Sequence, residues 1–150
     1  SIEHDVKWKF DIYGAGTEYK NIQKYVNDDI ALNKHIERNE LLEKISDIPV
    51  ALISLDERIT IEGFPGKTFD YLSMNKVLLS ISNKESAVAK FIEKYSLGVN
   101  IEPDSVKSFL DAFEKLSSRQ FLSETLLNVS NINKNQIEKS EIVKKYLTLI

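Results

Sequence analysis

Residues 49–82 read PVALISLDERITIEGFPGKTFDYLSMNKVLLSIS, and this stretch decides the fold class. It begins and ends with an apolar run, at residues 49–55 and 76–82. Nearly continuous apolar runs of this length are typical of parallel strands that are covered on both faces. Between them stand a Pro-Gly turn and a helical pattern at residues 66–74. The order strand, helix, strand predicts one unit of a parallel sheet.

The same alternation continues on both sides of this unit. Further strands are predicted at residues 7–14, 30–36 and 98–102, and helices at residues 17–26, 38–46, 85–96 and 104–117. Strands that alternate with helices over short loops predict an α/β fold. We expect a Rossmann-like three-layer domain with a mainly parallel sheet of about five strands and helices on both faces.

Three further predictions concern the second half of the chain. Gly98 is expected to end the helix before it, and Asp104 to cap the helix after it. That second helix should face the core through a stripe of apolar residues, namely Val106, Phe109, Leu110 and Phe113. Residues 120–150 are polar and rich in asparagine, and we expect them to form a weakly helical C-terminal tail.

Composition narrows the class of protein. The chain has 150 residues, of which 42% are hydrophobic, as expected for one globular domain. A net charge of -3 argues against binding to nucleic acid. The absence of cysteine excludes disulfides and thiolate chemistry, and no apolar run is long enough to span a membrane. His4 and His35 are isolated, so we expect no metal site. No other cofactor is expected.

The loop before the helix at residues 66–74 carries the most unusual chemistry. Pro65 and Gly66 form a turn with an accessible backbone, and the helix that follows opens with free N–H groups suited to a phosphate. Lys67 in the first turn opposes the helix dipole, so a bound anion would explain its position. Asp70 and Glu62 can accept hydrogen bonds from hydroxyl groups. Phosphate on the backbone and hydroxyls on acids predict a nucleotide or nucleotide-sugar site.

These residues resemble a known motif. EGFPGKTFDYLSMNK is similar to the E-x-x-P-x-K-x-x-(D/E)-Y-L-x-x-x-K signature of the group 1 retaining glycosyltransferases, which have two Rossmann-like (GT-B) domains. The acidic pair of that family is Glu-x7-Glu, and Glu62 and Asp70 have the same spacing with Asp as the second acid. Val77 stands where the family usually has proline.

The resemblance implies roles for individual residues. Asp70 would bind the ribose hydroxyls of the donor, and Glu62, the first acidic residue of the motif, would face the transferred sugar as the catalytic residue. The turn at Pro65 would present the N–H groups of Gly66 and Lys67 to the pyrophosphate.

The glycine loop has a part in the same resemblance. Gly14 and Gly16 stand where the family has its G-x-G loop, and they would lie against the nucleotide. Tyr19 replaces the third glycine of a dinucleotide fingerprint, which argues against nicotinamide binding.

The resemblance also implies how the whole protein is organised. Residues 1–150 would be the C-terminal, donor-binding half of a glycosyltransferase, whose N-terminal acceptor domain and basic pyrophosphate-binding pair lie outside this sequence. The enzyme would use a nucleoside-diphosphate sugar in glycan or bacterial envelope polysaccharide synthesis. It would act in the cytoplasm, with possible peripheral membrane contact, and this half alone would be inactive.

Two other classes stay open. One is a flavodoxin-like nucleotide-binding or regulatory module such as a receiver, which needs an acidic cluster after its first strand, where this chain has Gly14-Ala15-Gly16. The other is a nucleotide-sugar epimerase of the same fold. The base, the sugar and the acceptor are not specified by the sequence.

Overall fold

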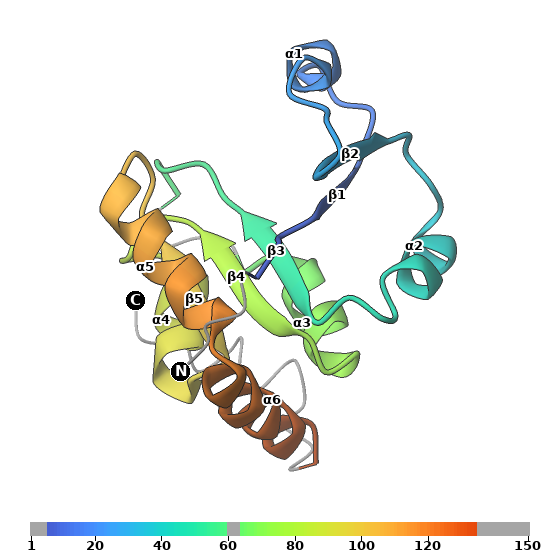
Figure 1. Cartoon of the computed structure of the whole chain (residues 1–150). Coiled ribbons are helices and arrows are strands. Elements are labelled where there is room, and N and C mark those ends of the chain that lie inside the picture. Colours follow the sequence, from blue (N-terminus) through green and yellow to red (C-terminus); the bar gives the residue numbers. More distant parts are fainter. Residues whose placement is uncertain (1–5, 60–63, 135–150) are drawn as a thin grey trace. The chain divides into compact units, whose positions relative to one another are not determined.

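The computed structural model describes residues 6–59 and 64–134 as two compact units, Ser1–Asp47 (unit 1) and Ile48–Ile150 (unit 2) (Figure 1). The α/β prediction is confirmed, and all five strands pair in parallel. They form two sheets, one of two strands in unit 1 and one of three strands in unit 2.

Unit 1 is a small βαβα segment. It consists of β1 (Phe10–Tyr13), α1 (Tyr19–Gln23), β2 (Ile30–Asn33) and α2 (Arg38–Lys44). The strands pair in parallel with Phe10 opposite Ile30. Every buried residue of the described chain lies at Ala51 or beyond, so the described part of unit 1 has no buried side chain. Two short strands and two short helices are too few to enclose a core.

Unit 2 contains the hydrophobic core. Its elements are β3 (Val50–Ser54), α3 (Gly66–Ser73), β4 (Val77–Ile81), α4 (Ala87–Tyr95), β5 (Gly98–Ile101), α5 (Val106–Ser117) and α6 (Arg119–Lys134). The strand order is β3-β4-β5, and Leu52 lies opposite Leu79 while Leu79 lies opposite Val99. The predicted unit at residues 49–82 is therefore present as β3, α3 and β4.

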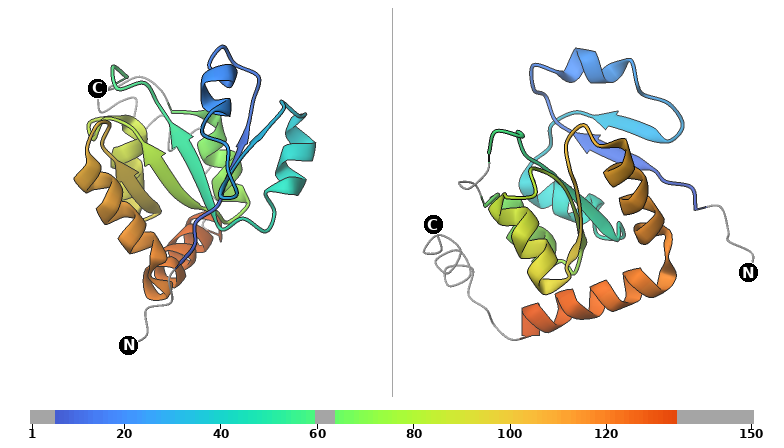
Figure 2. Two further views of the ribbon diagram at one scale, coloured as in Figure 1. Left: turned by 45° about the horizontal axis from the view of Figure 1, so that its top comes forward. Right: turned by 90° about the vertical axis from the view of Figure 1, so that its left-hand side faces the viewer.

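The core of unit 2 lies between the sheet and helices α3, α4 and α6. Its buried members are Ile53, Leu72, Leu78, Val88, Phe91, Ile92, Leu97 and Val129. Figure 2 (right) shows α4 and α5 on opposite sides of the three strands, with α6 crossing beneath them. The three-layer prediction therefore holds within unit 2.

Gly98 has a different role from the one predicted. It lies inside β5, and a Cβ there would come within 1.7 Å of the Leu78 carbonyl oxygen on β4. Helix α4 ends instead at Ser96, which adopts the left-handed conformation with φ 51°. Glycine is needed at 98 because two backbones approach closely, not because a helix stops there.

Two predictions about α5 are wrong. Its N-cap is Ser105, whose hydroxyl accepts a hydrogen bond from the Ser108 N–H at 3.1 Å, while Asp104 forms the preceding turn with φ 58°. The predicted stripe also lies mostly outside the core, since Val106 is 74% exposed, Leu110 61% and Phe109 45%. The residues of α5 that are buried are Ala112 and Leu116.

The first part of the predicted tail belongs to the core of unit 2. Residues 119–134 form the long helix α6, which buries Val129 and Thr125. The weak helix expected nearer the C-terminus lies outside the described residues. No helix within residues 6–59 and 64–134 is both long enough and apolar enough to cross a bilayer.

Candidate functional site

The carboxyl ends of β3, β4 and β5 lie at one edge of the sheet in unit 2, because the three strands are parallel. Helix α3 begins at this edge, and the loops at residues 82–86 and 102–105 border it. Open α/β sheets bind ligands beyond this edge. The loop predicted to bind the donor is therefore on the side of the sheet where a ligand is expected.

A polar network joins β5 to the end of β4 and to the loop at residues 82–86. The Asn100 Oδ1 accepts hydrogen bonds from the hydroxyls of Ser80 at 2.5 Å and Ser82 at 2.8 Å, and Asn100 Nδ2 donates to the Ser82 carbonyl at 3.0 Å. The Ser82 and Ser86 hydroxyls are 3.0 Å apart, and Ser86 caps α4 by accepting from the Ala89 N–H. All three serines are buried, so their hydroxyls support the loop and do not face a substrate.

The start of α3 is open. Pro65 occupies the N-cap position with ψ 132° and provides no side-chain cap, and its carbonyl accepts from the Thr68 N–H at 2.9 Å. In the described part of the chain, the N–H groups of Gly66 and Lys67 have no hydrogen-bond partner. A Cβ on Gly66 would meet no atom within 4 Å, so packing does not require glycine there. This backbone can be approached closely.

Aromatic packing fixes the loop in place. The Phe64 ring stacks on Phe69 with centroids 5.1 Å apart and meets Phe91 of α4 edge to face, also at 5.1 Å. Phe91 in turn contacts Tyr95 at 5.2 Å. The residue immediately before the turn is thus packed against the core next to the open end of α3.

Asp70 lies on the same face of α3 as Gly66, because residues four apart in a helix are neighbours. Side chains in a helix lean toward its N-terminus, so the carboxylate leans toward the open N–H groups. Thr68 is fully buried on another face, and its hydroxyl has no partner among the described residues. Burial raises the pKa of the neighbouring Tyr71 phenol, and the Asp70 carboxylate raises it further. The negative charge of Asp70 is therefore close to the Tyr71 phenol.

The first acid of the motif, Glu62, lies outside the described residues. Its pairing with Asp70 stays a prediction.

Sequence reasoning missed an ion pair at the same edge. Arg58 donates from Nε to the Asp56 Oδ1 at 2.7 Å and from its backbone N–H to the same oxygen at 2.9 Å. Hydrogen bonds from the Arg58 side chain hold the pKa of Asp56 well below its usual range. The signal was an Asp-Glu-Arg turn directly after β3.

The other predicted loop lies at the carboxyl end of β1 in unit 1. Gly14 donates its N–H to the Asn33 carbonyl at 3.2 Å, and the Gly16 carbonyl accepts from the Tyr19 N–H at 3.0 Å. A Cβ on either glycine would meet no atom within 4 Å. Since α3 belongs to unit 2, the prediction that both loops bind one nucleotide stays a prediction.

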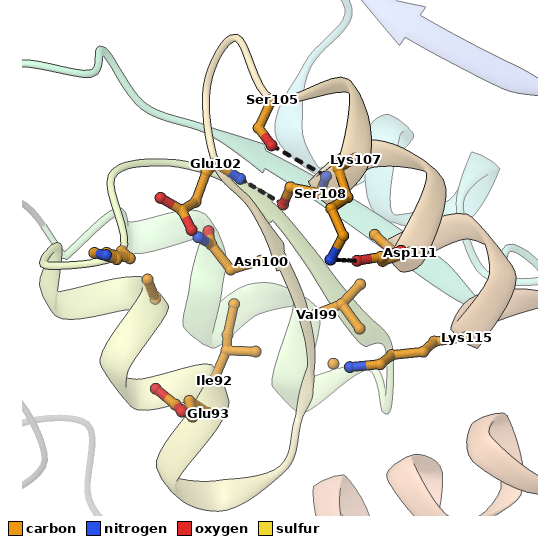
Figure 3. A pocket seen from close by; sticks show the side chains of 14 residues that line it. Ile92, Glu93, Val99, Asn100, Glu102, Ser105, Lys107, Ser108, Asp111 and Lys115 are labelled. Atoms are coloured by element: carbon orange, nitrogen blue, oxygen red, sulfur yellow. Dashed lines mark hydrogen bonds and ion pairs between the residues drawn. The ribbon is translucent and has the colours of Figure 1, made fainter.

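A different pocket, of about 530 Å³, lies between α4, β5 and α5 (Figure 3). Its charged groups have mixed signs, and Lys107 pairs with Asp111 at 3.3 Å. The Ser108 hydroxyl accepts from the Glu102 N–H at 2.9 Å. None of the predicted donor-binding residues lines this pocket, so we do not assign the donor to it.

No protein-family model, curated protein or solved structure matches the chain. The function must therefore be inferred from the motif and from the geometry around α3. Within the described ranges, no group of three His, Cys, Asp or Glu side chains is placed to hold a metal ion.

Proposed function

We propose that this chain is the donor-binding half of a retaining glycosyltransferase, which transfers a sugar from a nucleoside-diphosphate sugar to an acceptor during glycan synthesis. One observation carries the proposal. At the carboxyl edge of a parallel sheet, the open N–H groups of Gly66 and Lys67 lie one helical turn from the carboxylate of Asp70. Glu62 and Asp70 have the same sequence spacing as the acidic pair in the motif of the glycosyltransferase family.

The chemistry follows from the charges of these groups. The open N–H groups and the Lys67 ammonium would stabilise the diphosphate, which gains negative charge as it leaves the sugar. The Asp70 carboxylate repels phosphate but accepts hydrogen bonds from neutral hydroxyls, so it suits the ribose. Glu62 would face the transferred sugar.

In this proposal the acceptor is held by a partner half with its own Rossmann-like fold. Positioning of the acceptor is a large part of the catalytic effect, so the chain alone should not turn over. Incubation with a panel of nucleotide sugars and acceptors should release no diphosphate above background. Multiple turnover would contradict the proposal that a separate domain is needed to hold the acceptor.

The test of the donor site is the substitution Asp70→Ala. Calorimetric titration with uridine diphosphate and guanosine diphosphate measures the affinity. Hydrogen bonds to a charged acceptor contribute about 1.5–3 kcal/mol, so we expect affinity for the preferred nucleotide to fall about ten- to a hundredfold. Asp70→Asn should have a smaller effect, because the amide oxygen still accepts.

Glu114→Ala is the matched control, since it removes an exposed acid from the third turn of α5, away from the carboxyl edge. It should leave the affinity unchanged. Thermal melts of the free proteins separate binding from stability. If Asp70→Ala binds the diphosphate as tightly as wild type and only melts earlier, the carboxylate stabilises the helix and the proposed donor site is wrong.

A further inference from the structure

Unit 1 contains a pocket of about 710 Å³ at the carboxyl ends of β1 and β2. Residues 14–17 and the first residues of α1 form one side, and Lys34 and His35, which directly follow β2, form the other. Its volume is in the range that suits a small ligand. Parallel pairing of the two strands brings these segments together, although Lys20 and Lys34 are 14 positions apart in sequence.

The lining of this pocket is positively charged. It includes Lys20, Lys34 and His35 and contains no acid. Among the described residues, none of these three side chains belongs to an ion pair. Glu18, the nearest acid in sequence, accepts a hydrogen bond from Asn21 Nδ2 at 2.7 Å and does not line the pocket.

The backbone of the loop also offers hydrogen-bond donors to this pocket. The N–H groups of Ala15 and Gly16 have no hydrogen-bond partner within the described chain. Neither Gly14 nor Gly16 has a positive φ, and a Cβ on either would meet no atom within 4 Å. The fold therefore does not need glycine here, although glycine costs conformational entropy. The backbone at these two glycines is open to close approach by a ligand.

We propose that this pocket binds a phosphate group, held by Lys20 and Lys34 against the N–H groups of Ala15 and Gly16. A lysine ammonium and a row of backbone N–H groups are common ligands of phosphate. His35 can add a ring N–H donor. The site goes beyond the donor site at α3, because it assigns charged residues of unit 1 to an anion. The phosphate belongs either to the nucleotide donor or to a separate phosphorylated compound.

The test uses the full chain labelled with nitrogen-15 and inorganic pyrophosphate as the probe, at constant ionic strength. Binding should shift the amide resonances of Ala15 and Gly16. The double variant Lys20→Ala/Lys34→Ala should weaken pyrophosphate binding at least about tenfold, because each lysine makes a charge-assisted contact. Gly16→Ala should keep the amide spectrum of the folded protein and also weaken binding, since its Cβ occupies the space of the anion.

Lys24→Ala is the matched control. Lys24 is in the same unit, is exposed, and lies over the Tyr25 ring at 6.0 Å instead of lining the pocket. Lys24→Ala changes the net charge by the same amount as the loss of one pocket lysine. It should leave the dissociation constant of pyrophosphate unchanged within about twofold. The proposal is overturned if pyrophosphate leaves Ala15 and Gly16 unshifted. It is also overturned if Lys24→Ala weakens binding as much as Lys34→Ala does.

A nucleoside diphosphate and the matching free nucleoside distinguish the two sources of the phosphate. If the diphosphate shifts the amides of Gly16 and Gly66 together, the pocket holds a phosphate of the donor. If it shifts Gly16 and not Gly66, the phosphate pocket stands and the donor site at α3 is contradicted. If it shifts Gly66 and not Gly16, and pyrophosphate also leaves Gly16 unshifted, the donor site stands and the phosphate pocket is wrong. The affinity for the free nucleoside, which has no phosphate, should be the same in wild type and in Lys34→Ala.

Discussion

Asn133 on α6 donates from Nδ2 to the Leu72 carbonyl at the end of α3, at 2.6 Å, and also to the Asn75 Oδ1 at 2.9 Å. Asn128, on the same helix, donates in the same way to the Ser96 carbonyl at the end of α4, at 3.1 Å. These carbonyls belong to the turns that lead into β4 and β5. Helix α6 therefore fastens both turns at the amino end of the sheet, opposite the candidate site.

Asn133→Ala should lower the free energy of unfolding by about 0.5–1.5 kcal/mol, the usual net contribution of a hydrogen bond. Urea denaturation measures the change. Asn131→Ala is the control, because Asn131 is an exposed asparagine on the same helix whose side chain makes no hydrogen bond among the described residues. It should change stability by less than about 0.5 kcal/mol. Equal losses in the two variants would show that the hydrogen bond to the Leu72 carbonyl is not responsible, because alanine is the better helix former at both positions.

The orientation of α5 can be tested with two leucines of one helix. Leu116 is 1% exposed and Leu110 is 61% exposed. Leu116→Ala should cost about 2–5 kcal/mol, because it opens a cavity in the core. Leu110→Ala should stay within about 0.5 kcal/mol. Chemical denaturation of both variants gives the comparison, and a Leu110→Ala cost equal to that of Leu116→Ala would show that the stripe predicted from the sequence is buried after all.

Two glycines of unit 2 should respond in opposite ways to alanine. Gly66→Ala adds a methyl group where no atom lies within 4 Å, so we expect the protein to be as stable as wild type, or more stable by up to about 1 kcal/mol. Gly98→Ala places the methyl group against the Leu78 backbone and should cost more than about 4 kcal/mol or prevent folding. Thermal melts separate these outcomes. Under the proposed function, Gly66→Ala also binds the nucleoside diphosphate more weakly, and unchanged binding would show that the diphosphate does not approach this backbone.

The raised pKa of Tyr71 predicts a loss of stability in alkali. The folded pKa lies above the value of about 10 in the unfolded chain, so the contribution is complete below that pH and is lost as pH rises through the folded pKa. Tyr71→Phe has no phenol to ionise, and its stability should fall less over the same pH window. Tyr25→Phe, at a tyrosine that is 64% exposed, should follow wild type. Urea denaturation at a series of pH values checks this, and identical profiles for Tyr71→Phe and wild type would contradict the burial of the phenol.

Local pattern was enough to predict the order of the elements. The apolar runs at β3 and β4 and the alternation at β1 are properties of neighbouring residues, and each specifies a strand without reference to the rest of the chain. Parallel pairing within each sheet follows from the helix between successive strands. The open start of α3 was also predictable, because a Pro-Gly turn before a helix provides no side-chain cap.

Contacts between distant residues decided the rest. The side of α5 that is buried depends on which face meets β5, and small Ala112 beside Leu116 fits there while the larger Phe109 stays partly exposed. The sequence predicts Asn128 and Asn133 only as polar residues of a tail. In the structure, α6 places them against carbonyls 32 and 61 positions away. The phosphate pocket has the same origin, because Lys20 and Lys34 come together only when β1 pairs with β2. A sequence period shows which side chains a helix or strand can bury, whereas the partner that buries or pairs them is set by packing over long separations.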